Sequence, residues 1–311
     1  MPLNIETKGG SVLKTSLKLS DKTSRKIAEN VSSYVFLLPW MIILFVFTLY
    51  PFVEGIRMSL YDYSITKQTY VGLENFRKLF HDKTFWNSVI VTLKMCVIII
   101  PGTLVASLVV AYSMQDLSER SQSIVKVVFY LSSIISQVAL IMVWKWMFNP
   151  VYGLYRTLCE RFGFIELNLL GDATYSIPLI SILVLSFTVS QPIVLFSAAM
   201  DGVPQEYYEA AELDGASRFI QFFKITLPSI SNIILLVLVT TTINNLQVFV
   251  VPMLLTGGGP SGMTTPILLH IYRNAFEYQK FGYASAMGVV LFIIIAVFVA
   301  IQFLLQSKEG E

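Results

Sequence analysis

Apolar residues are gathered in six long runs that are separated by shorter polar stretches. Each run has about 20 residues or more, which is the length that an α-helix needs to cross the hydrocarbon core of a bilayer. The pattern therefore predicts an all-α membrane protein with six transmembrane helices. The runs are Ser33–Val53, Ser88–Ser113, Ile124–Met147, Ile177–Met200, Ile230–Leu255 and Ala284–Gln306.

Composition supports the same class of protein. Of the 311 residues, 55% are apolar and only 14% are charged, whereas soluble domains carry about 25% charged residues. The net charge of +2 is too small to indicate a nucleic-acid partner. Cys96 falls in an apolar run and Cys159 in a predicted loop, so no disulfide framework is implied.

The predicted orientation follows from the N-terminal tail. Six Lys and Arg residues precede the first apolar run, and a basic flank favours the cytoplasmic side. Six spans then return the C-terminus to the cytoplasm. The predicted outer loops, however, hold nine Lys and Arg residues, so the remaining loops do not support this orientation, and the reverse one stays open. The expected divisions are the tail 1–32, the first helix with its outer loop 33–83, five further helices 84–306 and the C-terminus 307–311.

Residues 204–228 are the longest charged interruption in the second half of the chain. Pro204 suits the start of a helix, because its missing N–H would be unpaired there. Tyr207, Ala210, Ala211 and Asp214 recur at helical spacing, and Gly215 follows where a left-handed residue can end the helix. We expect a second short helix over Ser217–Phe223. From periodicity alone, a surface helix lying on the membrane remains an equal alternative.

The identities within this stretch add a resemblance. Glu209-Ala210-Ala211, then Gly215, Ile225 and Leu227-Pro228, stand at the spacing of the EAA loop in the permeases of ABC importers, which this stretch resembles. We call residues 204–228 the EAA segment. The resemblance implies a type I importer permease fold in which a cytoplasmic coupling helix docks on a separate ATPase. The residues that it implicates in ATPase coupling are Glu209, Ala210, Ala211, Gly215, Leu227 and Pro228.

Two further stretches are similar to the carbohydrate branch of these permeases, which includes the maltose and glycerol-phosphate types. They are Val71–Phe76, with the sequence VGLENF, and Leu255–Pro260, with the sequence LTGGGP. The resemblance implies transport of a sugar or oligosaccharide in the plasma membrane of a bacterium or archaeon. The implied partners are a second related permease that completes a heterodimer, two ATPase copies and an extracytoplasmic binding protein.

Amide side chains inside two apolar runs are the candidates for a substrate path. Asn244, Asn245 and Gln247 lie in the fifth run, and Gln191 lies in the fourth beside Pro192. Amides at this depth are costly without partners, and hydrogen bonding between helices is the alternative to contact with a sugar. By resemblance, Asn245 falls where maltose-type permeases use an asparagine to hold sugar.

Several other functions lack the residues that they require. The glycine-rich stretch 257–264 has the spacing of a phosphate-binding loop, but Met263 replaces its lysine. We therefore expect no cofactor, no metal and no enzymatic activity in this chain, with ATP and Mg²⁺ held by the partner ATPase. The middles of the six runs contain no ionisable residue, which argues against an ion-coupled carrier. Three alternatives remain. They are an ion-coupled carrier, an ABC permease for amino acids, peptides or oxyanions, and a membrane scaffold or sensor.

Overall fold

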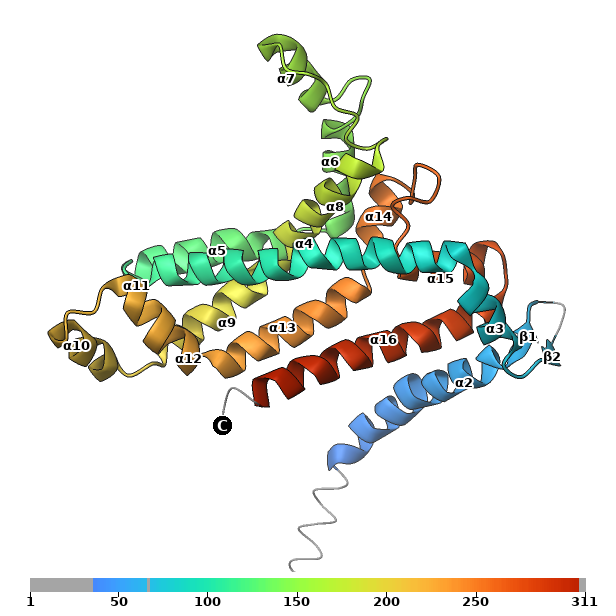
Figure 1. Ribbon diagram of the computed structural model, residues 1–311, viewed down its shortest axis with the longest axis horizontal. Coiled ribbons are helices and arrows are strands. Elements are labelled where there is room, and N and C mark those ends of the chain that lie inside the picture. The colour runs from blue at the N-terminus through green and yellow to red at the C-terminus, as the bar shows by residue number, and fades with distance from the viewer. Residues whose placement is uncertain (1–35, 66–67, 308–311) are drawn as a thin grey trace, which may run out of the picture. The chain divides into compact units, whose positions relative to one another are not determined.

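The computed structural model describes residues 36–65 and 68–307 (Figure 1). The chain divides into two compact units, one up to Arg57 and one from Met58 onward, and each is described by itself. Several predictions lie outside the described residues: those for the tail 1–32, for residues 33–35 of the first span, for Lys67 and for residues 308–311.

The first unit is dominated by one helix that begins at Phe36 among the described residues. Its large apolar side chains are exposed around the helix, as expected for a helix that lies in lipid. The helix continues past Val53, the predicted end of the span. Beyond that point Glu54 and Arg57 lie one turn apart and form an ion pair (Nε–Oε2 2.9 Å). Its segments are η1 (Phe45–Leu49) and α2 (Tyr50–Ser59).

The second unit is a helical bundle, and its described elements can be followed in Figure 1. Across the described residues, four helices are long and apolar enough to cross a membrane, or six spans if each of two bent pairs counts as one. The predicted helical membrane fold is therefore confirmed. The elements are β1 (Tyr61–Tyr63), β2 (Gln68–Tyr70), α3 (Glu74–His81), α4 (Lys83–Met114), α5 (Glu119–Ile134), α6 (Gln137–Met147), α7 (Leu154–Phe162), α8 (Ala173–Thr188), α9 (Ser190–Asp201), α10 (Gln205–Leu213), α11 (Arg218–Gln221), η2 (Phe222–Thr226), α12 (Leu227–Ser229), α13 (Ser231–Leu246), α14 (Val250–Leu255), α15 (Ile267–Tyr272), η3 (Arg273–Glu277) and α16 (Phe281–Ser307).

Three of the predicted spans are interrupted. The third bends by 87° between α5 and α6, where Ile135 is extended and Ser136 is not helical. The fourth bends by 49° between α8 and α9. The fifth is interrupted by residues 247–249 between α13 and α14.

Proline explains two of these interruptions. Pro192 is the third residue of α9 and Pro252 is the third residue of α14. A helix leaves the N–H groups of its first turn unpaired, so proline is tolerated there, whereas inside a continuous helix it would remove a hydrogen bond. Pro192 therefore lies at a new helix start.

A small antiparallel sheet follows the first helix, where only helices and loops are predicted. Tyr61 of β1 pairs with Tyr70 of β2. Asn75 Nδ2 on α3 donates to the carbonyl oxygens of Ser59 and Tyr61, both at 2.9 Å. A Cβ on Gly282 of α16 would lie 1.9 Å from the Tyr61 carbonyl oxygen. The hairpin therefore packs so closely against the start of the last helix that only glycine fits.

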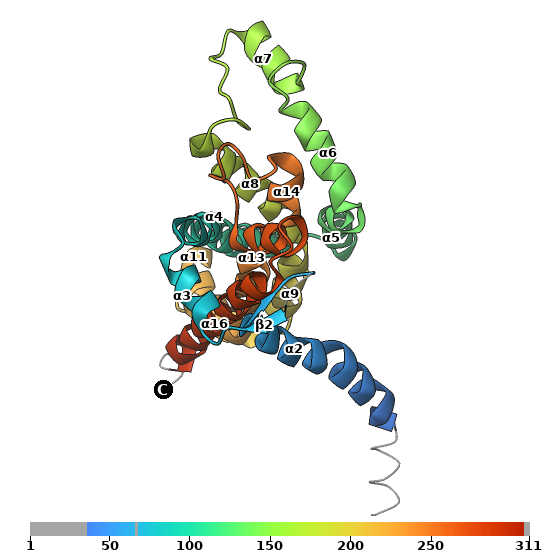
Figure 2. The same ribbon diagram turned by 90° about the vertical axis from the view of Figure 1, so that its right-hand side faces the viewer.

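Helix α4 is central to the bundle and packs against α8, α9 and α13 (Figures 1 and 2). At its start, Asp82 Oδ1 accepts from the Thr84 N–H at 2.8 Å, and Oδ2 accepts from the Tyr283 hydroxyl at 2.8 Å. Burial raises the pKa of Asp82, but these hydrogen bonds outweigh it and hold the pKa below the ordinary value. Midway along the helix, a Cβ on Gly102 would lie 2.5 Å from Leu185 Cδ1, so α4 and α8 approach closely.

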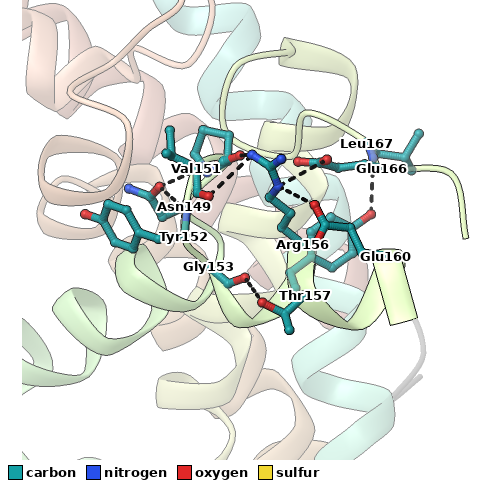
Figure 3. Close-up of polar contacts among 11 residues, drawn as sticks. Asn149, Val151, Tyr152, Gly153, Arg156, Thr157, Glu160, Glu166 and Leu167 are labelled. Atoms are coloured by element: carbon teal, nitrogen blue, oxygen red, sulfur yellow. Dashed lines mark hydrogen bonds and ion pairs between the residues drawn. The ribbon is translucent and has the colours of Figure 1, made fainter. Parts of the chain in front are cut away.

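Helix α7 and its flanking loops, residues 148–169, which we call the arm, extend away from the bundle in both views (Figures 1 and 2). Arg156 on α7 contacts residues before, within and after this helix (Figure 3). Its guanidinium donates to the Pro150 carbonyl oxygen at 3.0 Å. It also pairs with Glu160 (2.8 Å) and Glu166 (3.9 Å). The two flanks of α7 are thereby tied to the helix itself.

Candidate functional site

The EAA segment begins with α10 at one end of the bundle (Figure 1). Pro204 caps the helix. At the other end Gly215 is left-handed with φ +76°, and its N–H donates to the Glu212 carbonyl at 3.0 Å. The Ala216 N–H donates to the Ala211 carbonyl at 2.9 Å. These two bonds form a Schellman motif, so the predicted glycine turn is confirmed.

Most of α10 faces away from the rest of the chain, and Leu213 is 91% exposed. Tyr207, Ala210, Ala211 and Asp214 were predicted to share one face of the helix. Their exposure differs, because Ala211 is half-buried and the other three are exposed. The surface mixes apolar and acidic groups, as interfaces with an apolar centre and a polar rim do. The exposed side chains include Tyr207, Glu209, Ala210, Leu213 and Asp214.

The second half of the EAA segment is a continuous helical stretch in which α-helical and π-helical turns alternate. The helix predicted over Ser217–Phe223 is divided between α11 and η2, and α12 follows. Leu227 is half-buried and Pro228 is exposed. Tyr208 joins the two halves, because its hydroxyl lies 2.9 Å from the Thr226 hydroxyl, which is fully buried. This contact ties α10 to the end of η2 within the EAA segment.

A cavity of about 240 Å³ lies within the bundle, between α5, the α8–α9 bend and α13. Its polar groups are amides and hydroxyls, and its flat apolar faces come from Tyr130 and Phe187. The other lining residues are Ser133, Thr188, Ser190, Gln191, Pro192, Leu195, Val237, Thr240, Thr241, Asn244 and Asn245.

Three of the four residues predicted for the substrate path line this cavity: Gln191, Asn244 and Asn245. Gln191 and Asn244 are exposed. Asn245 is only 1% exposed, and its Nδ2 donates to the Thr241 carbonyl at 2.8 Å, within its own helix. Gln247 falls in the break after α13 and is not part of the lining. The amides are therefore brought together, but they differ in how freely they could meet a solute.

The contribution of α5 to the cavity was not predicted. Tyr130 and Ser133 lie on this helix just before the bend at Ile135. In the sequence, Tyr130 stands in an apolar run and is indistinguishable from a residue that packs against lipid. The serines at 132, 133 and 136 are the available signal, since hydroxyls compete for backbone hydrogen bonds and often accompany bends.

All three helix interruptions lie next to the cavity. Tyr130 and Ser133 precede the first, Thr188 and Ser190 flank the second, and Asn245 precedes the third. Beyond the first and third interruptions, α6 and α14 are joined by a hydrogen bond from Lys145 Nζ to the Leu254 carbonyl at 2.9 Å. The cavity therefore lies at the level of these interruptions. Within residues 36–65 and 68–307, no three His, Cys, Asp or Glu side chains gather to hold a metal ion.

Comparisons with known proteins agree with this arrangement. Residues 98–309 match the family described as "Binding-protein-dependent transport system inner membrane component". The "Probable ABC transporter permease protein YurN" of Bacillus subtilis is 31% identical over 271 residues, which cover 86% of this chain and 92% of YurN. The "Multiple sugar-binding transport system permease protein MsmF" of Streptococcus mutans is 30% identical and covers 92% of this chain and 99% of MsmF.

A solved structure shows the same fold. The crystal structure of a bacterial alginate ABC transporter in complex with an alginate pentasaccharide-bound periplasmic protein contains a chain that aligns with a TM-score of 0.77. The alignment covers 89% of this chain and 94% of that chain at 23% identity. The fold predicted from the EAA segment is thus confirmed, and the permease is a membrane subunit that is distinct from the ATPase. The chain belongs to the family of inner membrane components of binding-protein-dependent ABC transport systems.

Proposed function

We propose that this chain is one of two permease subunits of an ATP-driven importer that moves a sugar or oligosaccharide through the plasma membrane of a bacterium or archaeon. An extracytoplasmic binding protein delivers the solute, and two ATPase copies supply the work. The relatives support the substrate class, because MsmF is named for sugar transport. The alginate transporter, which was solved with its periplasmic protein, supports the binding-protein partner.

The observation that carries this proposal is the exposed EAA segment. In the chain by itself, Leu213 is 91% exposed and Phe219 is 73% exposed, and Glu209, one turn before Leu213 on α10, is exposed as well. Phe219 also packs against Phe223, which is exposed too, and an exposed patch of adjoining apolar side chains with a polar rim indicates a binding partner. The Schellman motif and the Tyr208–Thr226 contact hold the segment as one body, so that a docked ATPase can displace it without distorting it. We therefore assign the ATPase-coupling role to the EAA segment and place it, with both termini, in the cytoplasm.

The cavity supports a neutral, hydroxyl-rich solute. Gln191 and Asn244 present amides that can both donate to and accept from hydroxyl groups. Tyr130 and Phe187 offer flat apolar faces, as pockets for organic ligands commonly do. We place the solute path through this cavity, with Asn244 and Gln191 in contact with the sugar and Asn245 holding the shape of α13. Gln247 has a smaller part in this proposal, because it lies outside the lining.

The test is purification of the chain with its partners in mild detergent, followed by reconstitution into liposomes. We expect a second permease and a nucleotide-binding subunit to co-purify. We also expect the liposomes to accumulate labelled oligosaccharide only when ATP and the binding protein are both present. Uptake that proceeds without any ATPase would contradict the proposal and would instead identify a carrier.

A further inference from the structure

The EAA segment has a third attachment to the bundle, besides its covalent links to α9 and α13. Arg218, the first residue of α11, forms an ion pair with Asp116, which follows the end of α4. The Tyr112 hydroxyl in the last turn of α4 donates to the Arg218 carbonyl at 3.3 Å. Both contacts join residues more than 100 positions apart in the sequence. The end of α4 therefore contacts the segment through a side chain and through the backbone.

Further contacts fix the orientation of α11 on α4. The Tyr112 ring packs against Phe222 with a centroid distance of 4.6 Å. Phe222 also belongs to the apolar cluster around Phe196 and Met200 of α9. Gln221 is 7% exposed, and its Nε2 donates to the Ala216 carbonyl at 3.2 Å. A displacement of the EAA segment therefore cannot leave Tyr112 in place without breaking buried packing.

The middle of α4 contacts the wall of the cavity. The Thr103 and Thr188 hydroxyls are 3.2 Å apart, and Thr188 is both the last residue of α8 and a lining residue. One turn earlier on α8, Leu185 lies so close to Gly102 that a Cβ there would displace the end of the leucine side chain. Tyr112 and Thr103 are nine residues apart, or about 14 Å along a rigid helix. The contact with α8 comes directly before the 49° bend.

We propose that α4 transmits the displacement of the EAA segment to the α8–α9 bend, with Asp116 and Tyr112 as the receiving residues. This inference rests on the proposed function and assigns a positioning role to residues outside the EAA segment. In this proposal the bend is the element that takes two arrangements, as energetic coupling over such a distance requires. A push or pull on the end of α4 moves Thr103 against Thr188 and so changes the cavity wall.

The test is a charge swap in the whole complex, measured as the factor by which loaded binding protein stimulates ATP hydrolysis. Asp116→Arg and Arg218→Asp each place two like charges together, and we expect each to lower the stimulation about threefold, in keeping with an exposed ion pair. The double swap restores an attractive pair, and we expect it to recover most of the stimulation. Tyr112→Phe removes only the hydroxyl, and we expect a smaller loss.

Lys78→Glu is the matched control, because Lys78 forms a similarly exposed pair with Glu74 on α3. We expect it to retain wild-type stimulation. Unchanged stimulation in both single variants, or no recovery in the double swap, would overturn the role of α4. If the wild-type complex itself shows no stimulation, the proposed function fails together with this inference, so the two failures are distinguishable.

A cross-link tests whether the two parts move together. In a background with Cys96→Ser and Cys159→Ser, Asp116→Cys and Arg218→Cys are joined by a short bismaleimide, since an arginine–aspartate pair is usually wider than a disulfide tolerates. Because the proposal treats the end of α4 and α11 as one moving body, we expect the cross-linked importer to keep at least half of its ATP-dependent uptake. Loss of uptake on cross-linking, but not on labelling either single cysteine, would show that the two must separate and would overturn the proposal.

Discussion

The EAA segment is made from consecutive residues, 204–228, whereas the cavity collects side chains from α5, α8, α9 and α13. The shape of the segment depends on local features, namely the Gly215 turn and the Tyr208–Thr226 contact. The shape of the cavity depends on where three of the spans are interrupted. It also depends on the contacts between the helices on either side of these interruptions. A partner-binding surface can thus be specified by a short motif, while a solute path requires agreement among distant parts of the chain.

This difference predicts where substitutions act. A change in the segment should disturb coupling to the ATPase and leave solute selection intact, because few of its contacts reach the cavity. A change in the cavity should alter the apparent affinity for the solute and leave assembly intact. The α4 contact is the exception, since it joins the two regions.

The largest effect is expected for Gly215→Val. No atom lies within 4 Å of the position where a Cβ would stand, so the cost comes from the φ of +76°, which β-branched residues strongly disfavour. We expect the stimulation of ATP hydrolysis by binding protein to be abolished while the complex still assembles. Gly163→Val is the matched control, because Gly163 ends α7 with φ +69° and equally open surroundings. If both variants lose the stimulation of ATP hydrolysis equally, the loss reflects general destabilisation and not a role of the Gly215 turn in coupling.

Leu213→Asp should have the next largest effect. We assign Leu213, which is 91% exposed in the free chain, as a hot spot of the interface, and loss of a hot spot costs about 2 kcal/mol, or about 30-fold in affinity. We expect the ATPase to bind about 30-fold more weakly to the variant permease in detergent. Ile165→Asp in the arm, where the side chain is 85% exposed, should leave ATPase affinity unchanged. If the Leu213→Asp permease binds the ATPase with wild-type affinity, then Leu213 of α10 is not part of the docking surface.

Asn244→Leu tests the cavity, which Asn244 lines. Loss of one hydrogen bond to a neutral group costs about 1 kcal/mol, so we expect the solute concentration for half-maximal uptake to rise roughly fivefold to tenfold. The maximal ATP-dependent rate should change little. Gln247→Leu serves as the control, because this exposed amide lies outside the cavity lining. An equal shift in both variants would mean that the path does not follow the cavity.

The smallest effect is expected for Lys145→Met, which removes the hydrogen bond from Lys145 Nζ to the Leu254 carbonyl. The side chain is exposed, so the contribution is about 1 kcal/mol at most, and the midpoint of thermal unfolding in detergent should fall by about 2–4 °C. Lys94→Met offers a comparison at a lysine that shows no such bond between described helices. An unchanged midpoint in Lys145→Met would mean that the bends are held by apolar packing alone.

The sequence predicted the EAA segment in detail because its signals are local. Pro204 and Gly215 act on their own backbone, and the motif requires no knowledge of other helices. The cavity was only partly predictable. Gln191 and Asn244 stood out as amides in apolar runs, but Tyr130 carries no such signal. The bend at Ile135 and Ser136 contains neither proline nor glycine, so its position depends on packing between distant helices, as does the hairpin at Tyr61.

The Gly282 contact has a consequence for the biosynthesis of this protein. Tyr61 is translated more than 200 residues before Gly282, yet its carbonyl rests directly against that glycine. Asn75 of α3 can bond to the Ser59 and Tyr61 carbonyls earlier, but the packing against α16 is missing until that helix has left the ribosome and entered the bilayer. A nascent chain that is halted before residue 282 should therefore leave the hairpin more sensitive to protease than full-length synthesis does.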